Sequence, residues 1–135
     1  MITGAQTGVP AVALSGPNAM LSRKSFDPPI SADALDAFTF NIIPERDVVP
    51  MIDDPAQNHQ SIRCNTDLAD VVGCHDSTRS LCEIIYSCGS EGRPIPCACV
   101  TTFGYPEPTP VDPSNTQSFA DFCANADINE LYIFQ

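Results

Sequence analysis

The segment that most constrains the fold is an apolar run, Phe38 to Ile43, which leads into a loop bounded by Pro44 and Pro50. Proline has no backbone N–H and cannot continue a sheet ladder, so we expect the strand to stop before Pro44. Asp47 then lies beyond the carboxyl end of this strand, where the acids and bases of α/β proteins usually gather. The sequence therefore predicts that Asp47 is a site residue, although a solvated Asp in a tight turn would give the same short string.

Two apolar runs with a helical segment between them predict an α/β fold. Residues 9–15 are apolar and bounded by glycines, which is typical of a buried parallel strand. Ser31 can cap a helical turn that ends near Ala37, just before the run at 38–43. This strand–helix–strand order is the pattern of a parallel sheet. Residues 53–74 are polar, and we expect them to be irregular.

A longer helix is predicted after residue 76. Apolar side chains recur there at helical spacing and would form one buried stripe: Leu81, Ile84, Ile85 and Cys88. Asp76 or Ser77 can cap its start, and Gly89 can adopt the left-handed conformation that ends many helices. Residues 117–134 are expected to form a weak final helix and an edge strand.

Charge excludes several classes of partner. The 135 residues carry a net charge of -11, with 17 acids against 6 bases. Nucleic acids and anionic membrane surfaces are bound through Lys and Arg, so neither is an expected partner. No apolar run approaches the roughly 18 residues that a membrane-spanning helix needs. Residues 109–135 contain no Lys or Arg and are expected to form a separate, solvated acidic tail.

Cysteine content indicates a disulfide framework. The chain has 7 cysteines, six of them in one short stretch: Cys64, Cys74, Cys82, Cys88, Cys97 and Cys99. An even set at short spacings is typical of a secreted or extracellular domain, although spacing alone leaves the connectivity open. Cys123 stands apart and is expected to be unpaired.

Metal and cofactor sites are not expected. Cys97, Cys99 and His75 are possible zinc ligands, but the paired C-x₂-C knuckles of structural zinc modules are missing. Asp53 and Asp54 could suggest calcium, yet they lack the spaced run of oxygen ligands that a loop site needs. We expect a solvated turn at that position.

Two segments together resemble a known family. The strand followed by Asp47-Val48-Val49-Pro50 resembles the acid loop of class 3 (fungal-type) lipases, written D-x-V-P. The segment from Cys74-His75 to Cys82-Glu83-Ile84 resembles a cysteine-flanked histidine segment in a cysteine-rich subgroup of these lipases. The helix tail at residues 1–8, which lacks the features of a signal peptide, resembles the helix that follows the nucleophile in that family.

The resemblance implies a Ser-His-Asp triad in which Asp47 is the acid and His75 the base. His59 lies in a polar loop and is expected to be a surface residue. The G-x-S-x-G nucleophile elbow is missing, and Ser15 does not replace it, because Ala13 and Pro17 stand where the motif needs glycines. The nucleophile is therefore not expected among these residues.

Two hypotheses about function follow. In the first, residues 1–108 are the C-terminal half of an α/β-hydrolase sheet, a fragment of a lipase or other carboxylic ester hydrolase of lipid metabolism. The complete protein would act on a lipid or ester substrate, and the isolated chain would be inactive. In the second, the chain is a secreted, disulfide-rich binding or structural module without catalysis.

Overall fold

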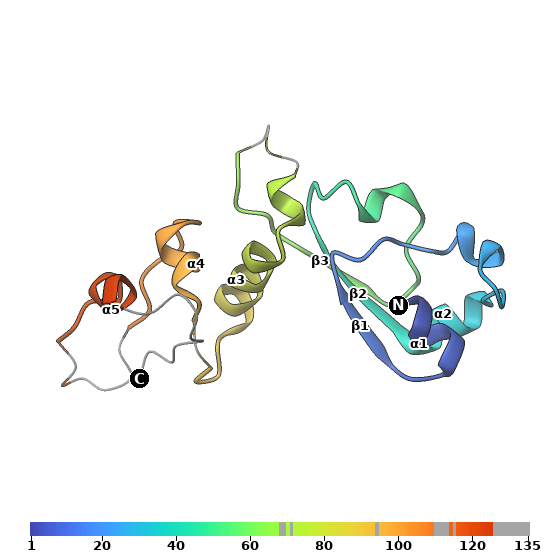
Figure 1. Ribbon diagram of the computed structural model, residues 1–135, viewed down its shortest axis with the longest axis horizontal. Helices are drawn as coiled ribbons and strands as arrows, with labels where there is room; N and C mark the ends of the chain where they lie inside the picture. Colours follow the sequence, from blue (N-terminus) through green and yellow to red (C-terminus); the bar gives the residue numbers. More distant parts are fainter. Residues whose placement is uncertain (68–69, 71, 94, 110–113, 115, 126–135) are drawn as a thin grey trace. The chain divides into compact units, whose positions relative to one another are not determined.

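The structure, a computed structural model, describes residues 1–67, 70, 72–93, 95–109, 114 and 116–125. The chain forms two compact units, Met1–Ser80 and Leu81–Gln135. The expected boundary at residue 108 between a lipase-like region and an acidic tail stays a prediction. Figure 1 shows the helices and strands in chain order, with the sheet in the first unit.

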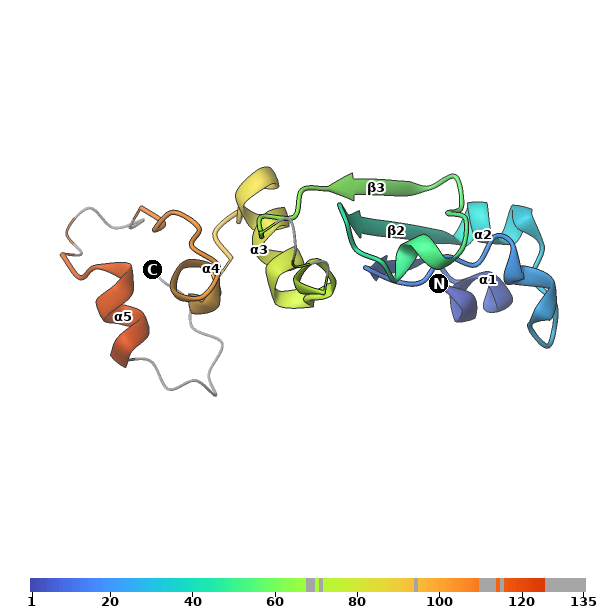
Figure 2. The same cartoon turned by 90° about the horizontal axis from the view of Figure 1, so that it is seen from above.

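The first unit is an α/β arrangement built on a small parallel sheet. Strands β1 (Ala11–Leu14), β2 (Thr39–Pro44) and β3 (His59–Ile62) lie in the order β1-β2-β3. Both pairs are parallel, with Ala11 opposite Thr39 and Asn41 opposite His59. The arrows of β2 and β3 point the same way in Figure 2. The small parallel sheet and the helices beside it therefore confirm the predicted α/β class, though not a particular fold within that class.

Two short helices cover part of this sheet. Helix α1 (Ile2–Thr7) packs against β1, and α2 (Ala32–Phe38) packs against α1 and β2. The Ser31 hydroxyl accepts a hydrogen bond from the backbone N–H of Ala34, which confirms the predicted cap. Leu35 of α2 is the most deeply buried residue of a core that also holds Ala5, Ala19, Ile30 and Ala56. Gly4 lets α1 approach β1, because a Cβ there would lie 2.7 Å from that of Ala11.

Strand β2 extends one residue further than expected, to Pro44. The backbone N–H of Ser15 donates to the carbonyl of Ile42 at 2.8 Å. Pro44 lies two residues later on the same strand, so its nitrogen faces the β1 side, where β1 has already ended at Leu14. The missing N–H of Pro44 therefore costs the ladder nothing.

Strand β3 lies within the region expected to be irregular, so that expectation was wrong at residues 59–62. His59, Gln60 and Ser61 are all exposed, and the strand has no apolar alternation to reveal it. Backbone pairing with β2, not side-chain burial, forms this edge strand.

The second unit is helical and cross-linked. Helix α3 (Ser77–Cys88) runs into it and is followed by α4 (Cys97–Thr101) and α5 (Phe119–Asn125). Asp76 caps α3 by accepting from the N–H of Thr78 at 2.8 Å, as the sequence predicted. Gly89, at φ 90°, follows the helix in the left-handed region.

The buried face of α3 differs from the predicted apolar stripe. Cys82 and Glu83 are buried, whereas Leu81 and Cys88 are exposed. Two interactions explain this difference, a hydrogen bond and a disulfide. The Tyr105 hydroxyl donates to the Glu83 carboxylate at 2.7 Å. Cys82 is bonded to Cys99 beside it.

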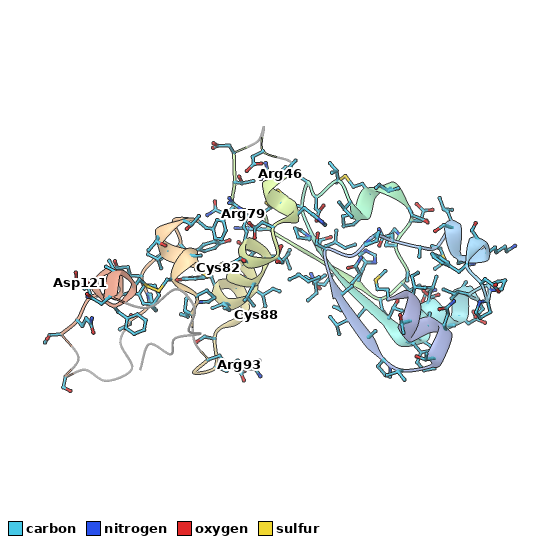
Figure 3. All side chains as sticks on the ribbon, viewed as in Figure 1. Arg46, Arg79, Cys82, Cys88, Arg93 and Asp121 are labelled. Atoms are coloured by element: carbon cyan, nitrogen blue, oxygen red, sulfur yellow. A yellow bond between two sulfur atoms is a disulfide. The ribbon has the colours of Figure 1, made fainter. Side chains whose placement is uncertain are left out.

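The disulfides correct the expected cysteine set. Cys64 is bonded to Cys74, Cys82 to Cys99 and Cys97 to Cys123. Cys123, expected to be unpaired, is thus bonded, and Cys88 (labelled in Figure 3) is the free, exposed thiol. The helix α5 carries Cys123 to α4, a contact that spacing along the chain does not reveal. Three disulfides are compatible with an oxidising, extracellular environment.

None of the described helices is long and apolar enough to cross a membrane. The final helix predicted over 117–134 is present as α5, and the predicted edge strand lies outside the described residues.

Candidate acid–base site

The candidate site lies where the first two strands end, within the first unit. Ser15 follows β1 directly, and Asp47 lies in the loop that leaves β2. His75 closes the 3₁₀ helix η3 (Gly73–His75), which precedes α3. Parallel neighbouring strands bring their carboxyl ends to one edge of the sheet, so residues distant in sequence meet there.

Asp47 is fully buried, and both oxygens of its carboxylate accept hydrogen bonds. Its side chain is 0% exposed. One oxygen, Oδ1, accepts from the backbone N–H of Val49 at 2.9 Å, and Oδ2 accepts from the Ser15 hydroxyl. A buried carboxylate needs such partners, because leaving it unpaired would be costly. The acid is therefore held in one orientation.

His75 presents one ring nitrogen to this carboxylate. Its Nδ1 lies 3.1 Å from Asp47 Oδ2 and 2.8 Å from Ser15 Oγ. The imidazole side chain is 44% exposed. Among the described residues, none forms a hydrogen bond with the other nitrogen, Nε2. The ring therefore joins a buried acid on one side to an accessible nitrogen on the other.

Asp47 and His75, the two site residues predicted from the sequence, are thus in contact. The other histidine, His59, is not part of this contact. His59 is exposed at the start of β3, and its Nδ1 lies 2.9 Å from the carbonyl of Ala56. A carbonyl only accepts, so this Nδ1 carries the proton.

An arginine and a disulfide hold the His75 loop against the Asp47 loop. Arg46, next to the acid and labelled in Figure 3, donates from Nη2 to the carbonyls of Cys64 at 2.7 Å and Thr66 at 3.2 Å. Cys64 is bonded to Cys74, the residue before His75. The histidine backbone is therefore tied to the loop that carries the acid through one guanidinium and one covalent link.

A buried amide pair holds the far end of the acid loop. Asn41 of β2 donates from Nδ2 to the carbonyl of Gly16 at 2.8 Å and to Oδ1 of Asn18 at 3.1 Å. Asn18 in turn donates to the carbonyls of Pro50 and Asp53. The turn after β1 and the loop after β2 are thereby joined through side chains that are almost completely buried.

Asp53 fixes the same loop by capping a neighbouring segment. Its carboxylate accepts from the N–H groups of Leu21 at 2.6 Å and Ser22 at 3.0 Å, and from the Ser22 hydroxyl at 2.6 Å. Burial opposes ionisation, but these hydrogen bonds outweigh it and hold the pKa of Asp53 below its usual value. The expected solvated turn is therefore a capping carboxylate.

Metal binding has no support in the described part of the chain. No group of three or more His, Cys, Asp or Glu side chains that could hold a metal ion occurs there. Cys97 and Cys99, the possible zinc ligands, are both in disulfides and are not available as thiolates.

Sequence reasoning missed the part that Ser15 and Arg46 play. As a nucleophile, Ser15 lacks the flanking glycines of the elbow motif. Its position at the end of the predicted strand 9–15, beside the strand that precedes Asp47, was the signal for a contact with the acid. No comparable signal marks Arg46, because its partners are backbone carbonyls.

No model of a known protein family, no characterised protein and no solved structure matches this chain.

Proposed function

We propose that Asp47 and His75 are the acid–base pair of a serine ester hydrolase that resembles the class 3 lipases. The observation that carries this proposal is the contact between Asp47 Oδ2 and His75 Nδ1, with the acid buried and the ring partly exposed. In a Ser-His-Asp triad the acid binds Nδ1–H, and the opposite nitrogen serves the nucleophile. The accessible Nε2 of His75 suits that second role.

The chemistry follows from this orientation. Nε2 of His75 takes the proton from a serine hydroxyl as the oxygen attacks the acyl carbonyl, and then gives it to the departing alkoxide. Asp47 keeps Nδ1 protonated and stabilises the imidazolium formed in between. The serine and the oxyanion hole come from a segment outside these 135 residues, and the first unit is then part of the C-terminal half of an α/β-hydrolase domain.

The substrate in this proposal is a carboxylic ester, and by the resemblance a lipid ester. The site of action is extracellular, which the three disulfides support. The isolated chain should show no ester turnover, because its sequence lacks the G-x-S-x-G elbow, which carries the nucleophile and part of the oxyanion hole.

A second candidate function is favoured by the disulfides of the helical unit. Cys82–Cys99 and Cys97–Cys123 cross-link α3, α4 and α5, as in small secreted modules that bind or support other molecules. In that case the Asp47–His75 contact is a structural hydrogen bond.

One experiment decides between the two. A longer protein, in which the natural upstream coding segment precedes these residues, is assayed on short and long acyl esters. We expect hydrolysis that falls roughly 10³-fold or more in Asp47→Asn and in His75→Ala. Asp54→Asn and His59→Ala are the matched controls and should leave turnover unchanged. An upstream segment without G-x-S-x-G, or turnover that survives both site substitutions, would favour the structural module.

A further inference from the structure

We propose that Ser15 is the positioning residue of the Asp47–His75 pair: its hydroxyl fixes the acid and thereby the tautomer of the base. This inference rests on the proposed function of that pair. Ser15 Oγ donates to Asp47 Oδ2 and lies 2.8 Å from His75 Nδ1, so one hydroxyl contacts both members. Ser15 is 4% exposed and follows β1, whereas Asp47 lies in the loop after β2 and His75 ends η3.

Ser15 is placed on the wrong side of the ring to be a nucleophile. A nucleophilic serine hydrogen-bonds to the nitrogen that the acid does not hold. Ser15 instead lies at Nδ1, the nitrogen that already faces Asp47. Its burial also denies an ester carbonyl the access that attack requires.

Counting protons around the three groups gives the tautomer. Asp47 Oδ2 accepts the Ser15 hydroxyl proton. The hydroxyl has only one proton, so the imidazole must supply the proton for the contacts that it makes with Asp47 and Ser15. All three groups are satisfied only when His75 carries its proton on Nδ1. The basic lone pair is then on the accessible Nε2.

The backbone of Ser15 is fixed independently of this network. Its φ is 57°, a left-handed conformation that is uncommon outside glycine, asparagine and aspartate. Its N–H donates to the Ile42 carbonyl at 2.8 Å, and the next residue, Gly16, exchanges hydrogen bonds with the amide of Asn41. Unfavourable backbone conformations persist where the surroundings determine them, often at functional sites. The hydroxyl is therefore presented to Asp47 by the sheet.

The test measures the tautomer of His75 by two-bond ¹H–¹⁵N NMR of the 135-residue chain at alkaline pH, where imidazole rings are neutral. The decisive variant is Ser15→Gly, which removes the hydroxyl and adopts positive φ without strain. Ser15→Ala removes the same hydroxyl but keeps the strained backbone. Ser61→Ala, at an exposed serine of β3, is the matched control, and His59 is the internal reference.

We expect the Nδ1–H tautomer for His75 in the wild type and in Ser61→Ala. In both Ser15 variants we expect the ring ¹⁵N shifts of His75 to move toward those of a mixture of tautomers, with His59 unchanged. If the role of Ser15 were purely structural, Ser15→Ala would change the stability of the protein, but the ring ¹⁵N shifts of His75 in folded Ser15→Gly would remain as in the wild type. That result would overturn the inference. An Nε2–H tautomer in the wild type would overturn the inference and remove support from the Asp47–His75 pair itself. Loss of turnover in Asp47→Asn of the longer protein, together with unchanged shifts in Ser15→Gly, would overturn only the role of Ser15.

Discussion

Arg46 and Cys64 are joined by a hydrogen bond of 2.7 Å, from Nη2 of the guanidinium to the backbone carbonyl. The same guanidinium also donates to the carbonyls of Thr66 at 3.2 Å and Asp67 at 3.1 Å. Arginine is suited to this task, because its planar fork offers several donors in fixed directions. The segment leading to the Cys64–Cys74 disulfide is thereby held next to the acid loop.

We expect Arg46→Lys to lower the free energy of unfolding by about 1.5–3 kcal/mol, since a lysine ammonium cannot reproduce the fork and leaves carbonyls without their charged donor. Urea denaturation measures this change. Arg63→Lys makes the same chemical change at an exposed neighbour and should stay within about 0.5 kcal/mol of the wild type. Equal effects of the two substitutions would show that the hydrogen bonds of the Arg46 guanidinium contribute no stability.

Local signals in the sequence were sufficient for helices α2 and α3 and for the two apolar strands, whereas α4 was not predicted. Ser31 before α2 and Asp76 before α3 act within four residues of themselves, and such caps depend little on the rest of the fold. The strand β3 could not be found in this way, because its pairing with β2 is a backbone interaction between distant segments. The buried face of α3 was also missed, since the buried Glu83 accepts a hydrogen bond from Tyr105, which is distant in sequence.

In the candidate site, too, some features have local signals in the sequence and others depend on distant segments. Asp47 could be singled out because proline limits its strand, and His75 because it precedes a capped helix. Their contact depends on Arg46 and on the Cys64–Cys74 disulfide, whose partners lie in another part of the sequence. A single sequence carries no direct record of such pairings, so the spacing of the cysteines does not determine their connectivity.

The cysteine assignment predicts one reactive thiol in the folded chain, that of Cys88. Titration with a thiol reagent should give one equivalent in the native protein and seven after reduction and unfolding. Peptide mapping of the alkylated native chain should place the label on Cys88. Label on Cys123 would agree with the unpaired Cys123 expected from the sequence and contradict the Cys97–Cys123 bond.

The Cys64–Cys74 bond should also stabilise the first unit. Replacing both cysteines by alanine should lower the free energy of unfolding by about 3 kcal/mol, on the chain-entropy estimate for a loop of this size. Cys88→Ala is the control and should have little effect, because it breaks no bond. Thermal denaturation of the three proteins gives the comparison.

One face of the sheet carries exposed apolar side chains. Val12 and Phe40 are opposite each other in register on β1 and β2, and they are 71% and 38% exposed. Parallel sheets normally have both faces covered, so this face favours self-association. We expect the chain to bind a hydrophobic dye and to aggregate, and Val12→Thr with Phe40→Thr to reduce both. Unchanged dye binding and light scattering in the double variant would show that this face is not responsible.

The last prediction concerns the pH dependence that Asp53 gives to the first unit. Hydrogen bonds from Leu21 and Ser22, which outweigh the opposing effect of burial, lower the pKa of Asp53 in the folded state below its ordinary value of 3.8. A group whose folded pKa is lowered contributes stability above its unfolded pKa, and this contribution is lost as the pH falls through the folded pKa. The free energy of unfolding should therefore decline as the pH drops below about 4.

Asp53→Asn should remove part of that decline and lower the stability at neutral pH by on the order of 1 kcal/mol, because an amide oxygen accepts less strongly than a carboxylate. Urea denaturation at a series of pH values between neutrality and strong acid measures both effects. Asp54→Asn is the matched control, since its exposed side chain forms no hydrogen bond with any described residue, and it should follow the wild-type curve at neutral pH. If Asp53→Asn had the stability of the wild type and the same decline of the free energy of unfolding at acid pH, the hydrogen bonds from Leu21 and Ser22 to Asp53 would not hold the loop.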